Sequence, residues 1–263
     1  MSWFLDPEKI KEAISNSRAA GIKVAVLDSG VEISHPALAG LVLADDLAIS
    51  DEGPKIRVVP GDGKDVFGHG TAVAGVVRQF APEAKIGSIR VLGSQNTSRT
   101  AVIARAAQEA LDRGYQVINC SFGCGVVRQV LQYKSWVDEA YLKGAHVIAA
   151  CNNEDFTKPE WPAYFASVIS VNMARTDDDS VFYYKRGTLV EFAAKGVDVK
   201  VLWSGKGEKC VTGSSFAAPR LAALVARILS VFPNASPLEM KAALHVLAKP
   251  WEREIAAANV LST

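Results

Sequence analysis

The sequence predicts one α/β domain over residues 1–263, with a mostly parallel central sheet flanked by helices. Apolar runs alternate with amphipathic stretches along the chain, as strands alternate with crossover helices in a parallel sheet. No linker, low-complexity tract or repeat of solenoid period divides the chain. Hydrophobic residues make up 49% of the sequence, which is enough to fill a large core.

The first half of the chain alternates strands and helices after a short helical extension over residues 1–20. The run IKVAVL is apolar apart from Lys23, as in a buried strand, whereas RTAVIARAAQEALDR has apolar residues at helical spacing and stops at Gly114. Strands are expected over 22–27, 85–92 and 115–121, and helices over 71–80 and 99–113.

The second half repeats this alternation and closes with two helices. Gly144 ends one helix, and an Asn-Ala-Ser-Pro start signal opens the last one. Helices are expected over 128–143, 215–231 and 236–247, and strands over 145–151, 168–171 and 189–194. The polar segments 45–65, 153–160 and 174–188 resist assignment and are long enough to be functional loops.

The charge balance argues against partners that are recognised by a strong electrostatic field. The chain has 29 basic and 28 acidic residues, a formal net charge of +1. We therefore expect no nucleic-acid partner and no membrane partner. No stretch of the sequence approaches the roughly 20 apolar residues that span a bilayer.

The N-terminus and the cysteines predict a cytoplasmic protein. The first residues contain no apolar block of the length that a secretory signal needs. The four cysteines lie in or beside apolar, strand-like runs, where a reduced cysteine behaves as a small buried hydrophobe. We expect no disulfides.

Three motifs carry the side chains of a possible catalytic site. In VAVLDSG, Asp28 follows a buried strand, although a nucleotide-binding domain could also carry an acid there. In DVFGHGTAVAGVV, His69 lies between two glycines at a helix entrance, where a surface histidine capping the helix is the alternative. In TGSSFAAPRL, Ser215 opens an apolar helix with Pro219 in its first turn, where ordinary capping serines are the alternative.

Taken together, the three motifs resemble the signatures of the subtilisin family, in the same order and at comparable spacing. The resemblance implies a three-layer subtilisin-like fold and a serine endopeptidase that acts on peptide or protein substrates. The order of acid, base and nucleophile is one of the known orders of this triad. A serine hydroxyl is a poor nucleophile near neutral pH, so His69 would accept its proton while Asp28 orients the imidazole.

The resemblance also implies an oxyanion hole and a substrate-binding segment. The family supplies an asparagine as one donor, and counting without gaps through ACNNED places Asn153 there, with Asn152 as the alternative. The amide of Ser215 would be the second donor. An extended peptide would pair with the segment formed by Ser121, Phe122, Gly123 and Cys124, while Glu154 would line the adjacent pocket. The alternative for this segment is an ordinary buried strand.

Several departures from the family pattern limit which family properties can be expected of this chain. The helix after His69 runs on without the oxygen-rich insertion that calcium requires, so we expect no metal, and no cofactor. We expect the residues before the first strand to form a short helix rather than a prodomain, unless the natural gene is longer than this chain. Asp65 could border the substrate groove or be a solvated loop acid.

The sequence leaves three functions open. The first is an intracellular endopeptidase with the triad in use. The second is a protease or transpeptidase that matures one dedicated precursor. The third is a non-catalytic peptide-binding relative, which draws support only from the unusual residues Ala72, Asn152 and Ser214.

Overall fold

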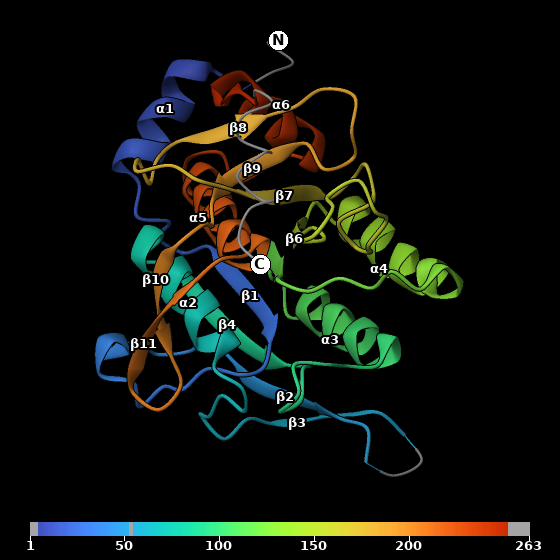
Figure 1. Ribbon diagram of the computed structural model, residues 1–263. Coiled ribbons are helices and arrows are strands. Elements are labelled where there is room, and N and C mark those ends of the chain that lie inside the picture. The colour runs from blue at the N-terminus through green and yellow to red at the C-terminus, as the bar shows by residue number, and fades with distance from the viewer. Residues whose placement is uncertain (1–4, 53–54, 252–263) are drawn as a thin grey trace.

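The computed structural model describes residues 5–52 and 55–251, and a ten-stranded sheet runs through its middle (Figure 1). The order of its strands is β12-β8-β9-β7-β6-β5-β1-β4-β2-β3. The seven strands that lie between β8 and β3 in this order all pair in parallel with their neighbours among the seven. These strands are β1 (Lys23–Asp28), β2 (Asp46–Ser50), β4 (Lys85–Arg90), β5 (Val117–Cys120), β6 (His146–Ala150), β7 (Ile169–Ala174) and β9 (Phe192–Lys195).

Short strands close the two edges of this sheet. At one edge β3 (Arg57–Pro60) pairs antiparallel with β2. At the other edge β8 (Phe182–Tyr184) pairs antiparallel with β9 and is followed by β12 (Lys249–Pro250). A separate antiparallel hairpin of β10 (Val199–Trp203) and β11 (Gly207–Val211) packs against α2 (His69–Phe80).

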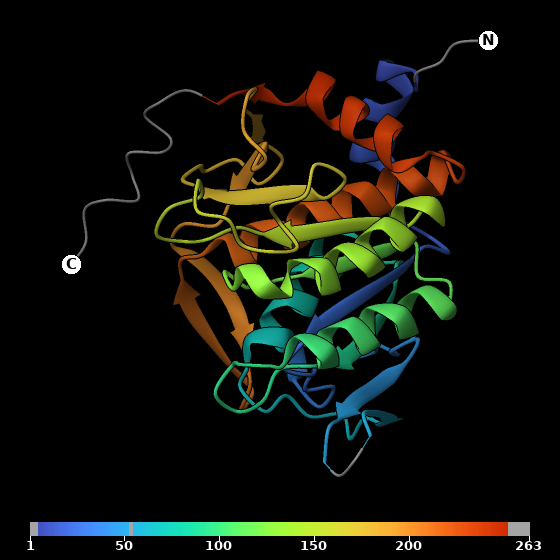
Figure 2. The same ribbon diagram turned by 90° about the vertical axis from the view of Figure 1, so that its right-hand side faces the viewer.

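Helices cover both faces of the sheet and complete three layers (Figures 1 and 2). On one face lie α2 and α5 (Ser214–Val231), with α1 (Pro7–Asn16) packed against α5 and α6 (Pro237–Leu247) packed against α1. On the other face lie α3 (Thr100–Asp112) and α4 (Val130–Leu142). The remaining described helical turns are the 3-10 segments Pro36–Leu38 and Val127–Gln129.

Strand β1 shows why the sheet is buried on both sides. Its residues alternate between the two hydrophobic clusters, so that Val24 and Val26 face α2 and α5, whereas Ala25 and Leu27 face α3 and α4. A strand with helices on both faces needs an almost continuously apolar sequence, and in β1 the run VAVL after Lys23 meets that need. The expected three-layer α/β fold is therefore confirmed.

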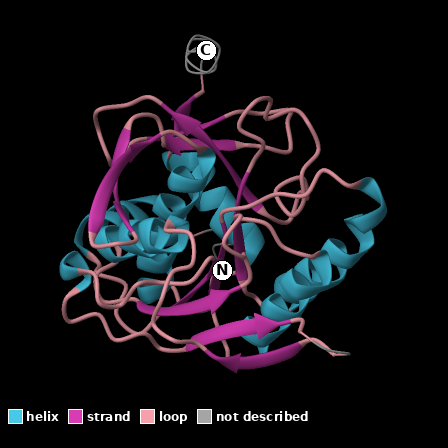
Figure 3. Cartoon of the chain, turned by 60° about the horizontal axis from the view of Figure 1, so that its bottom comes forward, coloured by secondary structure: helices cyan, strands magenta, loops and turns pink. Residues whose placement is uncertain are grey.

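The expected helices and strands are present, and their boundaries agree to within a few residues. The structure adds β2 and β3 within 45–65, β8 within 174–188, and the β10–β11 hairpin, none of which was expected. Figure 3 shows how much of the remaining chain is loop.

Helix α5 is the central helix of the molecule. Its length and apolar composition alone would suit a membrane span, but 78% of this helix is buried inside the fold. Its first residue lies near the carboxyl ends of β5 and β6, and α2 begins beside the end of β1. Open parallel sheets place their chemistry at this edge.

Candidate active site

The carboxylate of Asp28 and the imidazole of His69 form a buried pair. Asp28 is the last residue of β1, and His69 is the first residue of α2. The His69 Nδ1 lies 2.8 Å from one carboxylate oxygen of Asp28 and 3.0 Å from the other. Because a carboxylate can only accept, Nδ1 carries the proton, and Nε2 of the neutral ring is left as the basic nitrogen.

The surroundings of His69 raise the pKa of its imidazole. Burial acts to lower this pKa, because a charged ring loses its water. The negative charge of Asp28, its hydrogen bond and the charge of Asp65 act in the opposite direction and outweigh burial. The ring is thus 6% exposed and yet stabilised as a cation.

Glycines on both sides of His69 allow α2 to start against its neighbours. Gly68 has a φ of 112°, in the region that favours glycine, and a Cβ there would overlap the Trp203 indole. A Cβ at Gly70 would overlap the carbonyl oxygen of Gly30 in the loop after β1. The two glycines therefore bring the helix start close enough for His69 to reach Asp28.

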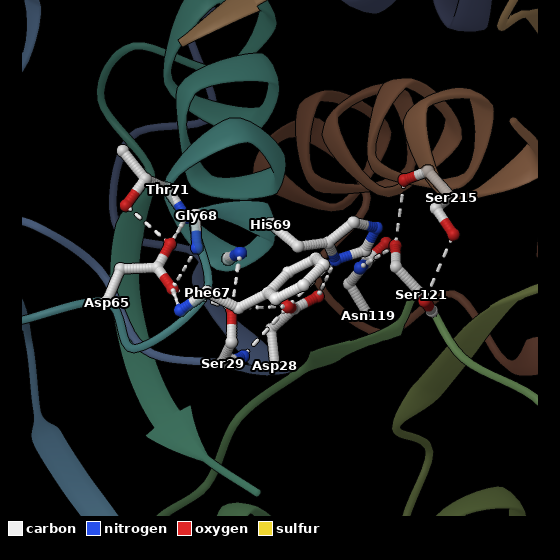
Figure 4. Close-up of polar contacts among 11 residues, drawn as sticks. Asp28, Ser29, Asp65, Phe67, Gly68, His69, Thr71, Asn119, Ser121 and Ser215 are labelled. Carbon is white, nitrogen blue, oxygen red and sulfur yellow. Dashed lines mark hydrogen bonds and ion pairs between the residues drawn. The ribbon is translucent and has the colours of Figure 1, made fainter. Parts of the chain in front are cut away.

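Asp65 anchors the start of α2 (Figure 4). One of its carboxylate oxygens accepts from the amides of Phe67 and Gly68 at 3.0 and 2.7 Å and from the Ser29 hydroxyl at 2.7 Å. The other accepts from the amide and the hydroxyl of Thr71, both at 2.7 Å. Its oxygens are occupied by the helix start and by Ser29, so Asp65 is not the freely solvated loop acid of the alternative expectation.

Ser215 lies in the first turn of α5, and its hydroxyl donates to the carbonyl oxygen of Ser121 at 3.1 Å. The Ser121 hydroxyl in turn donates to the carbonyl oxygen of Ser215 at 2.9 Å and accepts from Asn119 Nδ2 at 2.9 Å. Figure 4 shows the His69 ring between Asp28 on one side and Ser121 and Ser215 on the other. The structure thus gathers the three predicted triad residues, with the Ser215 hydroxyl turned to Ser121 rather than to His69.

The first turn of α5 leaves one amide available beside the Ser215 hydroxyl. The Ser214 amide donates to Asn153 Oδ1 at 2.8 Å, and the Phe216 amide donates to the Gly213 carbonyl at 3.1 Å. Within residues 5–52 and 55–251, the Ser215 amide between them has no acceptor. The N-terminus of a helix also favours negative charge.

The two candidate oxyanion asparagines have different surroundings. Asn152 is occupied by its own loop, because its Oδ1 accepts from the amides of Glu154 and Asp155 and its Nδ2 donates to Glu160 at 2.7 Å. Asn153 Oδ1 faces the Ser214 amide, which can only donate, so its Nδ2 faces away from that amide. The geometry therefore favours Asn153 as the donor.

The expected substrate segment has one free side. Cys124 exchanges both backbone hydrogen bonds with Trp161, at 2.9 and 3.0 Å, in an antiparallel bridge. In such a pair the next residue points its amide and carbonyl the opposite way, so Gly123 faces away from Trp161. The side chain of Phe122 packs into the cluster below α3 and α4, and Ser121 is buried.

Glu154, which the sequence predicts to line the substrate pocket, lies at the surface of its loop. Its side chain is 86% exposed and pairs with Lys158 at 3.7 Å, so it points into solvent. The acid that contacts the segment is Glu160, whose Oε2 lies 2.5 Å from where a Cβ of Gly123 would be.

Sequence reasoning also missed Ser29 and the role of Asn119. Ser29 links Asp65 to the Gly70 amide, and Asn119 supports the Ser121 hydroxyl. Ser29 lies within the VAVLDSG motif and Asn119 within VINC, so their positions beside element ends were the available signals. Glu160 stands in an unassigned polar segment and had none.

Comparisons with known proteins agree with one another. Residues 19–256 match the model of the family described as "Subtilase family". Thermitase of Thermoactinomyces vulgaris is 30% identical over 243 residues, which cover 88% of this chain and 83% of that protein. A thermophilic serine proteinase of Bacillus sp. (strain AK1) is 31% identical over 81% of this chain and 53% of its own length.

Solved structures resemble the fold over nearly the whole chain. The S41 psychrophilic protease has a TM-score of 0.74 at 27% identity and covers 90% of this chain and 88% of its own. Sphericase has the same TM-score and coverage at 25% identity.

Proposed function

Since the chain belongs to the subtilase family and is a subtilisin-like serine endopeptidase, we propose that Asp28, His69 and Ser215 are its catalytic triad and that it works inside the cell. The observation that carries the proposed triad is the buried Asp28–His69 pair beside the first turn of α5. Family membership sets aside the non-catalytic alternative.

The first step activates Ser215. Its hydroxyl turns from the Ser121 carbonyl towards His69 Nε2, a rotation about one side-chain bond. As the oxygen attacks the substrate carbonyl carbon, its proton passes to Nε2, and Asp28 stabilises the imidazolium through Nδ1. The raised pKa of His69 supports this role, because the ring holds the proton it receives.

The attack turns the substrate carbonyl oxygen into an oxyanion. The Ser215 amide and Asn153 Nδ2 are the proposed donors, and the helix start adds a favourable field. Ser214 holds the asparagine by its oxygen, so the amide nitrogen is fixed without a rearrangement during the reaction.

The second half of the cycle returns the proton. Nε2 gives it to the leaving amine as the carbon–nitrogen bond breaks, which leaves an acyl ester on Ser215. Water then attacks this ester with His69 again as base, the carboxylic acid leaves, and the Ser215 hydroxyl regains its proton. Attack by an amine in place of water would give transpeptidation, the alternative outcome of the same site.

The substrate chain is proposed to lie along the free side of Gly123. Its backbone amide and carbonyl are available for an extended peptide, while Cys124 holds the segment to Trp161 from behind. Such pairing would place a peptide carbonyl beside Ser215 without selecting its side chains.

The proposed intracellular location is supported by the cysteines. All four are free, Cys120 and Cys151 are buried, and Cys210 is an exposed thiol. An exposed thiol persists in a reducing compartment. Alkylation of the native, unreduced protein isolated from its cells should label Cys210, and a Cys210 in a mixed disulfide would argue against this location.

The test of the proposed triad is peptide cleavage by Ser215→Ala and His69→Ala beside the wild type. Loss of one member should lower kcat by about 10⁴- to 10⁶-fold, because the triad acts as a unit. Mass spectrometry of the products, with and without an added amine, separates hydrolysis from transpeptidation. Activity retained in Ser215→Ala would show that another residue is the nucleophile.

A further inference from the structure

The carboxylate of Glu160 lies against the backbone of the substrate segment. A Cβ built on Gly123 would meet Glu160 Oε2 at 2.5 Å and Glu160 Cβ at 3.1 Å. A Cβ on Gly125 would lie 3.9 Å from Glu160 Cγ. Because both positions are glycine, the Glu160 side chain can run directly beside the segment.

Glu160 also touches the loop that carries the proposed oxyanion donor. Its Oε1 accepts from Asn152 Nδ2 at 2.7 Å, and Asn152 directly precedes Asn153. The two segments that Glu160 touches extend from β5 and β6, which are neighbouring parallel strands. The carboxylate therefore lies between the segment that would bind the substrate backbone and the loop that would bind its carbonyl oxygen.

The negative charge of Glu160 has no cationic partner among residues 5–52 and 55–251. No ion pair between these residues involves Glu160, and its hydrogen-bond donor is the neutral amide of Asn152. The lysine of the same loop, Lys158, is instead near Glu154. A half-buried carboxylate without a counter-ion favours the approach of a cation.

We propose that Glu160 makes this protease selective for peptides with lysine or arginine on the acyl side of the cleaved bond. The inference rests on the proposed function, because it requires a peptide along Gly123 with its carbonyl between Ser215 and Asn153. The substrate residue that provides this carbonyl then directs its side chain between the substrate segment and the loop of Asn153, where the Glu160 carboxylate lies. A long cationic side chain reaches the carboxylate and forms a charge-assisted hydrogen bond.

Glu154 offers a matched comparison within the same loop. It has the same side chain, is adjacent to Asn153, and points into solvent. Its charge is screened by water, whereas that of Glu160 is only partly screened. Glu160→Gln removes the charge but keeps an oxygen that can accept from Asn152.

The experiment measures kcat/KM for peptides that differ only in the acyl-side residue, which is arginine, lysine, leucine, alanine or glutamate. A fluorophosphonate titration counts the active sites of each variant, and thermal melting reports folding. We expect arginine and lysine to be preferred over leucine. Glu160→Gln should lower the arginine-to-leucine ratio roughly 10- to 100-fold, the loss of one charged hydrogen bond, while Glu154→Gln keeps the ratio.

A second readout does not need turnover. Peptide phosphonates with either an amidinophenyl or a benzyl side chain label Ser215 at rates that report the same selectivity. The wild type should react faster with the cationic reagent, and Glu160→Gln should lose that advantage. The cationic advantage should also fall with rising salt.

The outcomes separate the inference from the proposed function. Preference for leucine or alanine, or an unchanged ratio in Glu160→Gln, would show that Glu160 only supports Asn152 and would overturn the inference. Loss of the preference in Glu154→Gln instead would overturn it as well. If neither cleavage nor labelling of Ser215 occurs, the proposed function fails and the inference fails with it.

Discussion

Replacing Asp65 with asparagine tests how the start of α2 positions His69. The substitution keeps the shape of the side chain but turns one acceptor oxygen into an amide group. If the retained oxygen continues to serve Ser29 and Gly68, the new amide faces the backbone amide of Thr71, which then has no acceptor. The Thr71 hydroxyl must also reverse, although it already accepts from the Glu32 amide at 3.0 Å.

The expected loss of folding stability follows from the two hydrogen bonds of Thr71 that Asp65→Asn removes or weakens. Hydrogen bonds to a charged group contribute about 1.5–3 kcal/mol each, and loss of a helix-capping side chain costs about 1 kcal/mol. Because Asp65 is only partly buried, we expect about 2–4 kcal/mol in total. For a chain of this length that lowers Tm by roughly 4–16 °C.

The same substitution changes the pH dependence of the reaction. Asp65 contributes to the raised pKa of His69, so its neutralisation should lower that pKa. Because the base acts in its deprotonated form, the acidic limb of the kcat/KM profile should move to lower pH.

The assay is calorimetric melting together with a pH profile of peptide cleavage. The matched control is Asp62→Asn, which removes an exposed acid of the same loop that pairs with Arg90 at 2.9 Å. If Asp65→Asn has the same Tm as Asp62→Asn and the acidic limb of its kcat/KM profile does not move, Asp65 does not anchor the helix start.

Three further predictions concern the oxyanion hole, the substrate segment and stability in acid. Asn153→Ala should lower kcat by about 10²- to 10³-fold with little change in KM. If Asn152→Ala instead lowers kcat as much at unchanged KM, Asn152 is the donor. Gly123→Ala should lower kcat/KM by about tenfold or more, because its methyl group displaces Glu160 and disturbs the peptide pairing; peptide kinetics equal to those of the wild type would contradict this. Burial lowers the pKa of His146 to about 4, so the unfolded chain binds more protons than the folded one between about pH 4 and 6.5. Urea unfolding should therefore lose about 2–3 kcal/mol of stability as pH falls through this window, and His146→Gln should remove that slope.

The residues of the proposed triad could be singled out from the sequence because each stands at or near the point where the chain changes from one element to another. Asp28 ends an apolar strand, His69 begins α2 directly after Gly68, and Ser215 lies in the first turn of α5, which follows Gly213. Strand ends and helix starts leave a trace in local sequence, through apolar runs, glycines and spacing. The parallel sheet then brings those ends to one edge.

The features that were missed depend on contacts between distant residues. The preference for Asn153 over Asn152 as the proposed donor rests on a hydrogen bond from Ser214, which lies 61 residues away. The contact of Glu160 with Gly123 joins two loops and has no periodic signal. The β10–β11 hairpin is half exposed, so its apolar alternation is weak. Such features follow from the assembled fold rather than from any one segment.

Mass spectrometry of the protein after reaction with a fluorophosphonate tests most directly whether a serine beside an imidazole–carboxylate pair carries the chemistry. The account predicts a single adduct that fragmentation of the labelled peptide assigns to Ser215, formed in the wild type and lost in His69→Ala. An adduct on Ser214 or Ser121, or one that forms equally fast without His69, would contradict it.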